Sequence, residues 1–339
     1  MHDALADEIC ELFDLGAPSG TPTSVEGGLT NRLWRLTTTR GAFAVKQMNR
    51  DVHRAGYVDW FDRAFTLEQA AFAALVPMPR PVPVAATGRC LGELPNGDGR
   101  PITVRVHEWV EGLRLDNSTP YSGQVAERVG SILARIHALG MSSEQAASET
   151  LHVFGVEHWR TLAERVDRAR ADWAEEFRGL LPVIGELEAY VVAAHSDLTG
   201  LLLSHRDSDP KNFMRAPGGE LLLVDWDAAG PVNPRHDLAN EALAWAGVHR
   251  GEPDPAVARA FVDAYRRDGG VSEAFRPTDL AELVVVRLFW FEFNVYRALG
   301  ERVRDESDRA LGAAVVRRNV TQLPRFARSL GAWLAILEQ

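Results

Sequence analysis

The stretch 201-LLLSHRDSDPKNFMRAPGGELLLVDWD-227 is the most informative part of this chain. Asp207 is followed five positions later by Asn212, and Asp225 comes directly after the apolar run 221–224. In metal-assisted phosphoryl transfer, one carboxylate faces the attacking hydroxyl while an amide oxygen and a second carboxylate hold a divalent metal against the phosphates. Magnesium prefers hard oxygen ligands and keeps several waters, so two side chains and a nucleotide are enough. The stretch therefore predicts a site for phosphoryl transfer.

The same residues have a simpler interpretation, because Asp and Asn are common in turns and an H-x-D triplet alone is a weak signal. The complete order of apolar run, H-R-D, tetrapeptide, Asn, Gly-rich turn, apolar strand and Asp is far rarer. We expect His205, Arg206 and Asp237 to brace the loop without taking part in the chemistry. Asp227 could be a second metal ligand or a turn residue at the end of the strand.

The composition is that of a soluble globular protein, with 339 residues of which 46% are hydrophobic and 25% charged. No stretch approaches the roughly 20 apolar residues that cross a membrane. The acidic start does not look like a secretory signal, and Cys10 and Cys90 are too few for a disulfide framework. We therefore expect a cytoplasmic protein without a membrane partner. The net charge of −10 argues against nucleic-acid binding and favours cationic partners.

The pattern along the chain predicts an α+β fold in two lobes. Short strands at 33–36 and 43–48, a helix at about 60–75, an extended segment at 76–83 and a strand at 102–106 make up the first part. Beyond a connector, the apolar spacing predicts three helices. The first ends near Gly140, the second spans about 159–177 and the third covers about 183–196. The expected division is an N-terminal nucleotide-binding lobe at 1–106, a hinge at 107–114 and a helical lobe at 115–339, with the ligand site in the cleft between lobes.

Lys46 lies inside an apolar strand, where an unpaired ammonium group would be costly to bury. We expect Glu68, on the following helix, to pair with it, so that Lys46 can contact nucleotide phosphates. Asp62 is the competing partner, although it lies nearer the start of the helix. In the hinge, the backbone from Glu108 to Val110 would meet the edge of the adenine base.

A glycine pair, Gly27-Gly28, lies in the segment 26–32, upstream of the strand expected at 33–36. Adjacent glycines let backbone amides approach phosphates closely, although such a turn can equally well close a hairpin. The sequence has neither a P-loop nor a G-x-G-x-x-G fingerprint here. The candidate phosphate contacts are Gly27, Gly28, Thr30 and Asn31.

From about Val25 to Leu238, these motifs together resemble the aminoglycoside phosphotransferase and choline kinase family, which has a bilobal protein-kinase-like fold. The resemblance rests on 43-FAVK-46, Glu68, the loop 205–212, 225-DWD-227 and 237-DLA-239. It implies that Asp207 is the catalytic base or the residue that orients the hydroxyl, and that Asn212 and Asp225 bind Mg²⁺. The implied cofactor is ATP, or alternatively GTP. Family members often have His-Gly-Asp where this chain has 205-HRD-207, and His-Pro-x-Asn where it has 209-DPKN-212.

Nothing in the sequence provides the activation segment that grips a protein substrate, so we expect a small acceptor. The leading hypothesis is a cationic compound of the aminoglycoside-antibiotic type. Choline, a macrolide, a sugar or a homoserine-like metabolite are alternatives, as is a catalytically silent nucleotide-binding module. The aromatic run 288–294 could belong to the core or could bind a cation. Oligomeric state cannot be read from the sequence.

Overall fold

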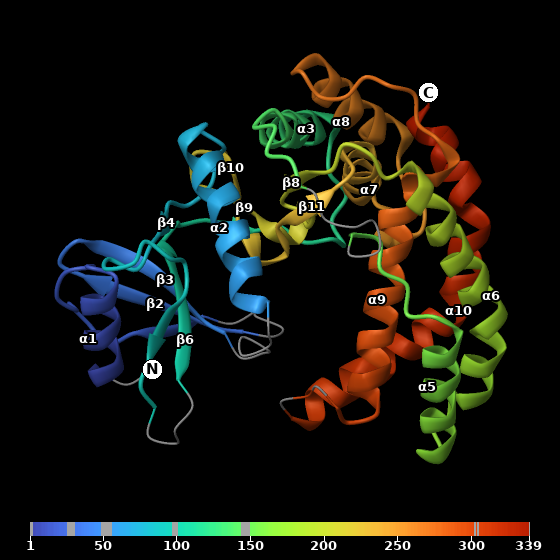
Figure 1. Ribbon diagram of the computed structural model, residues 1–339, viewed down its shortest axis with the longest axis horizontal. Coiled ribbons are helices and arrows are strands. Elements are labelled where there is room, and N and C mark those ends of the chain that lie inside the picture. Colours follow the sequence, from blue (N-terminus) through green and yellow to red (C-terminus); the bar gives the residue numbers. More distant parts are fainter. Residues whose placement is uncertain are drawn as a thin grey trace. The chain divides into compact units, whose positions relative to one another are not determined.

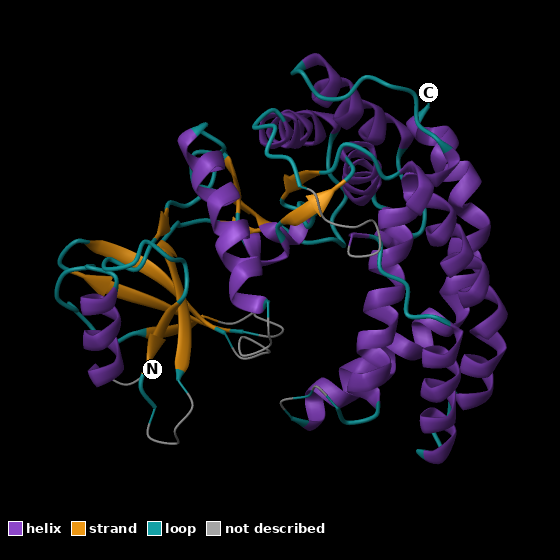
Figure 2. Cartoon of the chain, viewed as in Figure 1, coloured by secondary structure: helices purple, strands orange, loops and turns teal. Residues whose placement is uncertain are grey.

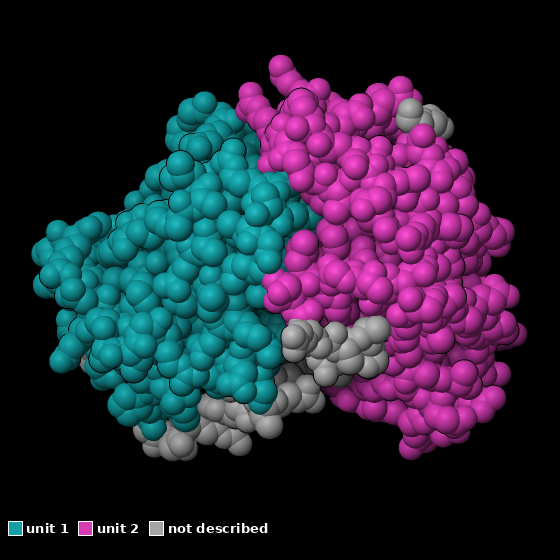
Figure 3. All heavy atoms as spheres, turned by 45° about the horizontal axis from the view of Figure 1, so that its top comes forward, with its two compact units in different colours: residues 1–119, 132–141, 203–230 teal, residues 120–131, 142–202, 231–339 magenta. Residues whose placement is uncertain are grey.

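The computed structural model describes residues 3–25, 31–48, 56–96, 101–143, 150–301, 303 and 305–338. They form two compact units, which Figure 3 shows in two colours. Unit 1 contains Met1–Thr119, Ile132–Met141 and Leu203–Gly230; unit 2 contains Pro120–Ser131, Ser142–Leu202 and Pro231–Gln339. The segment with the HRD motif thus belongs to unit 1, although its place in the sequence is in the expected C-terminal lobe. The lobe boundaries stay a prediction.

Unit 1 is built on an antiparallel sheet with the order β1-β2-β3-β6-β4, to which β5 adds by pairing with β6 (Figure 1). Its strands are β1 (Thr23–Val25), β2 (Arg32–Thr38), β3 (Gly41–Gln47), β4 (Pro81–Val82), β5 (Gly92–Leu94) and β6 (Ile102–Glu108). The predicted hairpin is confirmed as β2 and β3. In the register of β3 and β6, Lys46 lies opposite Arg105, so both side chains leave the same face of the sheet.

Two helices belong to this part of the chain. Helix α1 (Asp3–Leu12) buries Leu5, Ala6 and Ile9 in a core shared with β2, β3 and β6. Helix α2 (Tyr57–Ala73) matches the helix expected at about 60–75 and buries Phe61 and Phe65. Each helix buries one face against this part of the chain, and this packing stabilises the sheet that carries the candidate site residues.

A second antiparallel sheet of unit 1 has the order β10-β9-β7. Its strands are β7 (Leu113–Arg114), β9 (Phe213–Arg215) and β10 (Leu221–Leu223). The glycine pair at 218–219 closes the turn between β9 and β10, and Gly219 has a φ of 85°, which the missing Cβ makes inexpensive. This hairpin connects the loop 205–212 to Asp225.

Unit 2 is mainly helical (Figure 2). Its long helices are α5 (Val156–Arg168), α6 (Ala174–Ala194), α7 (Pro234–Ala246), α8 (Pro255–Arg267), α9 (Ala281–Ala298) and α10 (Glu306–Leu337), and α3 (Gly123–His137) is divided between the units. The strands β8 (Leu202–Ser204) and β11 (Gly230–Val232) lie where the chain passes from one unit to the other. Of the 3₁₀ turns in the described part of the chain, η1 (His195–Asp197), η4 (Val248–Arg250) and η5 (Pro277–Leu280) belong to unit 2, whereas η2 (Pro210–Asn212) and η3 (Trp226–Ala228) belong to unit 1.

The predicted helix over 159–177 is wrong, because the chain turns between α5 and α6. Arg170 has a φ of 51°, in the left-handed region that no helix continues through. The next helix begins at Ala174, earlier than the expected 183, and it continues through Pro182. The turn was not predicted because Trp173, which lies after it, is also buried in the core and so fits the helical spacing of apolar residues.

The aromatic run on α9 belongs mostly to the core of unit 2. Leu288, Phe291 and Phe293 are buried, whereas Phe289 remains 53% exposed. Phe291 stacks on Trp159 of α5 and on Phe177 of α6. In the described part of the chain, no helix combines the length and apolar character needed to span a membrane.

Candidate active site

The loop after β8 is held by its own side chains. The backbone N–H of Asp207 donates to Nδ1 of His205 at 3.3 Å, so Nε2 of this imidazole carries the proton and donates to the Val224 carbonyl at 3.2 Å. His205 is fully buried and packs edge-on against Trp226. As expected, His205 braces the loop. It does so through the carbonyl of Val224, the residue immediately before Asp225.

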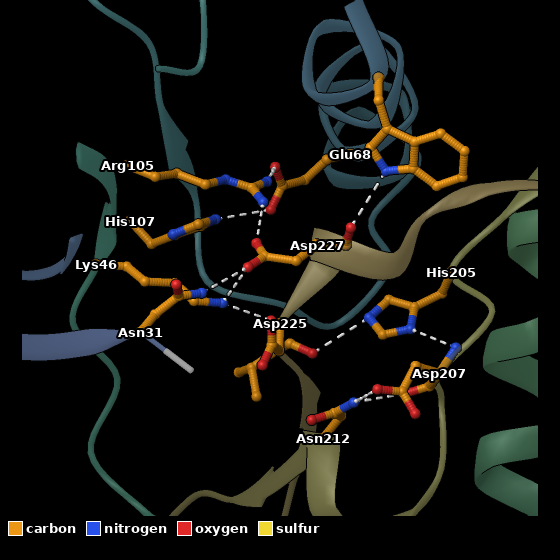
Figure 4. Close-up of polar contacts among 12 residues, drawn as sticks. Asn31, Lys46, Glu68, Arg105, His107, His205, Asp207, Asn212, Asp225 and Asp227 are labelled. Atoms are coloured by element: carbon orange, nitrogen blue, oxygen red, sulfur yellow. Dashed lines mark hydrogen bonds and ion pairs between the residues drawn. The ribbon is translucent and has the colours of Figure 1, made fainter. Parts of the chain in front are cut away.

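The short turn η2 directs Asn212 back toward Asp207. The Asn212 Nδ2 group donates to the carbonyl oxygen and to Oδ2 of Asp207, both at 2.7 Å. The Asn212 carbonyl oxygen accepts from the Val224 N–H at 2.9 Å, which ties the loop to the strand end. The candidate catalytic residue and both candidate metal ligands therefore lie in one cluster of unit 1 (Figure 4).

Lys211 contacts the candidate catalytic carboxylate directly. Its Nζ lies 2.5 Å from Oδ1 of Asp207 and 2.8 Å from Oδ2 of Asp209. Burial raises the pKa of Asp207 to about 6, against the opposing effect of Lys211, and Asp209 and Asp225 add to the rise. Asn117 supports this arrangement by donating to Asp209 at 2.9 Å. The result is a carboxylate with a proton affinity suited to general-base work near neutral pH.

Two residues of the site have left-handed backbone conformations. Arg206 has a φ of 62° and Asp225 a φ of 66°. Non-glycine residues seldom adopt this region, and strain of this kind clusters at functional sites. A glycine would adopt the conformation of Arg206 at lower cost, because it has no Cβ. Asp225 is the N-cap residue of the turn η3, where the chain leaves the direction of β10.

Lys46 forms ion pairs with two carboxylates after the strand β10. Its Nζ lies 2.6 Å from Oδ1 of Asp225 and 2.6 Å from Oδ2 of Asp227. Burial alone would lower the pKa of Lys46, but the two carboxylates outweigh it and raise the pKa above its ordinary value. Conversely, burial would raise the pKa of Asp225, and Lys46 holds it below its usual range. Both groups are charged at neutral pH.

The predicted ion pair between Lys46 and Glu68 is wrong in this structure. Glu68 is fully buried and pairs instead with Arg105 and, at 2.7 Å, with Nε2 of His107. Burial would raise the pKa of Glu68, but Arg105 and His107 lower it. Asp62, the competing candidate, pairs with Arg89 on the surface. The physical reason is that β6 carries Arg105 and His107 on the same face of the sheet as Lys46, and their ring and guanidinium nitrogens bind the Glu68 carboxylate.

Asp227 connects the two ion-pair systems. Its Oδ1 accepts a hydrogen bond from Arg105 at 2.7 Å. Its Oδ2 forms the ion pair with Lys46 and accepts a hydrogen bond from the side-chain amide of Asn31 at 3.3 Å. Both oxygens are therefore already engaged. Asp227 is neither a plain turn residue nor an available metal ligand here, but the centre of a network that joins β3, β6 and η3 (Figure 4).

The structure describes only some of the other residues that were expected to contact the nucleotide. Gly27, Gly28 and Thr30 lie outside the described residues, whereas Asn31 contacts Asp227. The Glu108 amide donates to the Arg80 carbonyl at 2.9 Å and its carboxylate pairs with the Arg80 guanidinium, so that amide is not available to a base. Val110 follows the end of β6 and remains a prediction.

The donor set at Asn212 and Asp225 fits a hard divalent cation. Because Asn212 donates through Nδ2, its Oδ1 is the atom left for a metal. Asp225 engages Lys46 through Oδ1 and is 43% exposed, and its Oδ2 has no partner among the described residues. No group of three or more His, Cys, Asp or Glu side chains that could hold a metal occurs in the described part of the chain. A cation here would thus need nucleotide phosphates to complete its ligands.

Sequence reasoning missed the supporting residues of this site: Arg105, His107, Lys211 and Asn117. A signal existed for Arg105, because an arginine in the middle of the apolar run 102–106 must find a buried partner. Lys211 stands within the quoted loop, four residues after Asp207, but no local pattern marks it. Asn117 could not have been found, since it meets Asp209 from 92 positions away.

The chain is similar to known phosphotransferases in sequence and in fold. The model of a family described as "Phosphotransferase enzyme family" matches residues 21–277. A search of curated proteins finds no significant match. Among solved structures, a spectinomycin phosphotransferase is similar at a TM-score of 0.65 and 12% identity, covering 97% of this chain and 99% of that one.

Two further structures give the same picture. An amicoumacin kinase has a TM-score of 0.63 and 15% identity over 94% of this chain and 92% of that one. A choline kinase from Streptococcus pneumoniae has a TM-score of 0.60 and 17% identity over 94% and 98%. At these identities the structures show a shared kinase-like fold, while the family model covers most of the chain. The chain therefore belongs to the phosphotransferase enzyme family.

Proposed function

We propose that this protein transfers the γ-phosphoryl group of ATP to a hydroxyl group of a small, cationic molecule. The observation that carries the proposal is the cluster of Asp207, Asn212 and Asp225, with Lys46 bound to Asp225. Charged groups of both signs converge there, as phosphoryl transfer requires, because its transition state needs positioning and charge stabilisation more than covalent chemistry.

In the proposed reaction, Asp207 orients the acceptor hydroxyl and accepts its proton. The hydrogen bonds from Asn212 fix one face of the carboxylate, and Lys211 lies against its other oxygen. A proton acceptor with a pKa of about 6 is deprotonated at neutral pH and still basic enough to take a proton as transfer proceeds.

Lys46 would contact the nucleotide phosphates. It is paired with Asp225 and Asp227, so nucleotide binding would exchange part of these contacts for phosphate oxygens. Asp227 remains anchored by Arg105 during that exchange. A divalent cation such as Mg²⁺, held by Asn212 Oδ1 and Asp225, would supply positive charge against the β- and γ-phosphates.

The acceptor class is proposed from charge and from the relatives. The net charge of −10 favours the approach of cations. The structurally similar proteins are described as acting on spectinomycin, amicoumacin, choline or aminopropanol. We take an aminoglycoside-type antibiotic as the first acceptor to test and a small amino alcohol as the second.

The experiment is a panel of acceptors incubated with ATP or GTP and Mg²⁺, with ADP formation and the phosphorylated product followed by ³¹P NMR. The panel contains aminoglycosides, spectinomycin, choline, aminopropanol, a macrolide, a hexose and homoserine. The proposal predicts acceptor-dependent ADP formation that is lost in Asp207→Asn. If nucleotide binds but no member raises ADP formation above the acceptor-free rate, the alternative of a silent nucleotide-binding module replaces it.

A further inference from the structure

Glu188, on α6, is a buried carboxylate without a cationic partner among the described residues. It is 6% exposed. Its Oε1 accepts three hydrogen bonds, from the N–H groups of Phe154 at 2.8 Å and Gly155 at 3.0 Å and from Nε1 of Trp159 at 2.9 Å. All three donors go to one oxygen. Because Asp and Glu are rarely buried without a cation or a complete set of donors, the second oxygen needs an explanation.

Glu188 lines a cavity of about 300 Å³ between α5 and α6. The two helices lie side by side in unit 2 (Figure 1). The cavity is lined by Val156, Trp159, Arg160, Leu181, Pro182, Ile184, Gly185 and Glu188. Its wall is thus mainly apolar with one carboxylate, and Arg160 is already paired with Glu157 on the surface. Its size is at the lower end of small-molecule sites.

The cavity is bordered by two residues that helices disfavour. Pro182 lies inside α6 and removes one of its hydrogen bonds, and Gly185 follows within one turn. A Cβ placed on Gly185 would meet no atom within 4 Å. A larger residue in place of Gly185 would stabilise the helix and fill the space next to it. Neither packing nor helix stability therefore explains why the cavity beside Glu188 is open.

We propose that this cavity binds a small organic ammonium ion. The ammonium group donates to Oε2 of Glu188, while the apolar body of the ligand lies against Leu181, Pro182 and Ile184. A neutral ligand of the same shape would leave the carboxylate unpaired in an apolar wall, which disfavours it. All lining residues belong to unit 2, and none of them is part of the phosphoryl-transfer cluster of unit 1, so the proposal does not rest on the proposed function.

The test is isothermal titration of the full chain with benzylammonium chloride, and with benzyl alcohol as the neutral probe of the same shape. Glu188→Gln keeps an acceptor for the three N–H donors and removes the charge. Gly185→Leu fills the cavity. Gly179→Leu is the matched control, because it lies on the same helix, also has no atom within 4 Å of an added Cβ, and does not line the cavity.

The proposal predicts that the wild type and Gly179→Leu bind benzylammonium equally well. Glu188→Gln should bind it at least tenfold more weakly, and Gly185→Leu should not bind it. Benzyl alcohol should bind at least tenfold more weakly than benzylammonium to the wild type. Equal affinity of Gly185→Leu and Gly179→Leu, equal affinity for the two probes, or no heat of binding at millimolar benzylammonium would each overturn it.

Discussion

At the scale of single residues, the contacts of Asp207 define what the loop can do. One carboxylate oxygen accepts from the Asn212 amide and the other meets the Lys211 ammonium group. These contacts fix the side chain before any substrate binds, which reduces the cost of orienting it during the reaction. Arg206 contributes to the same geometry, because its left-handed backbone turns the chain between His205 and Asp207.

We predict that Asp207→Asn lowers kcat by roughly 10²- to 10⁴-fold, the usual range for the loss of a general base. The asparagine can still accept from Asn212, so ATP affinity should stay within about twofold of the wild type. Steady-state kinetics on the best acceptor and titration of ATP by calorimetry measure the two quantities. A variant that retains wild-type kcat would remove Asp207 from the chemistry.

At the scale of secondary-structure elements, the network of Glu68, Arg105 and Asp227 joins α2, β6 and η3. Glu68 and Arg105 are both almost completely buried. Such a pair is costly to desolvate, and removing one partner leaves an uncompensated buried charge. The pair therefore contributes more to the position of Lys46 and Asp227 than to net stability.

We predict that Arg105→Gln destabilises the protein by about 3–5 kcal/mol, measured by chemical denaturation. Arg89→Gln is the control, because its pair with Asp62 lies at the surface, where solvent screening leaves an ion pair little effect on stability. The double variant Glu68→Gln, Arg105→Gln should recover part of the loss, since no buried charge is left unpaired. Equal losses for Arg105→Gln and Arg89→Gln would mean that the buried pair is not formed.

In unit 2, the buried carboxylate of Asp279 connects η5 to α7. It meets Arg235 at 3.1 Å and accepts from the Arg276 N–H at 2.8 Å, and His236 lies 3.4 Å away. Burial would raise the pKa of Asp279, but His236, the Arg276 amide and Arg235 lower it below 3.8. A group with a depressed pKa in the folded state adds stability above its unfolded pKa, and this stability is lost as the pH falls through the folded pKa.

We therefore predict that Asp279→Asn lowers the free energy of unfolding at pH 7 by about 3 kcal/mol. The difference from the wild type should shrink once the pH falls below 3.8, where the unfolded wild-type chain becomes protonated. Denaturation curves between pH 7 and pH 3 measure it. Asp172→Asn, in an exposed pair with Arg317, should show almost no difference at any pH. A constant difference for Asp279→Asn across the range would contradict this linkage.

At the scale of the whole molecule, the net charge of −10 should act on the approach of the acceptor. We predict that kcat/KM for a cationic acceptor falls about tenfold between 0.01 and 0.5 M salt, because screening shortens the range of the attraction. For a neutral acceptor of the same panel the change should stay within about twofold. Equal salt dependence of the two acceptors would show that charge does not guide the acceptor.

The sequence predicted those parts of the molecule that local patterns encode. The loop 205–212, the strand before Asp225 and the hairpin of β2 and β3 each carry their signal within a few residues. The partner of Glu68 could not be read this way, because the pairing of β3 with β6 places Arg105 beside Lys46 across 59 positions of sequence. The break between α5 and α6 was missed for a related reason. There, the left-handed conformation of Arg170 ends the helix, although the buried Trp173 continues the helical spacing of apolar residues.

We propose that Asn212 and Asp225 bind a divalent cation together with ATP. The most direct test is the affinity of Mn²⁺ for the protein in the presence of a non-hydrolysable ATP analogue, measured by electron paramagnetic resonance. We predict that Asp225→Asn and Asn212→Leu each weaken Mn²⁺ binding at least tenfold, whereas Asp62→Asn, in a surface ion pair, leaves it unchanged. Wild-type Mn²⁺ affinity in Asp225→Asn would contradict the account.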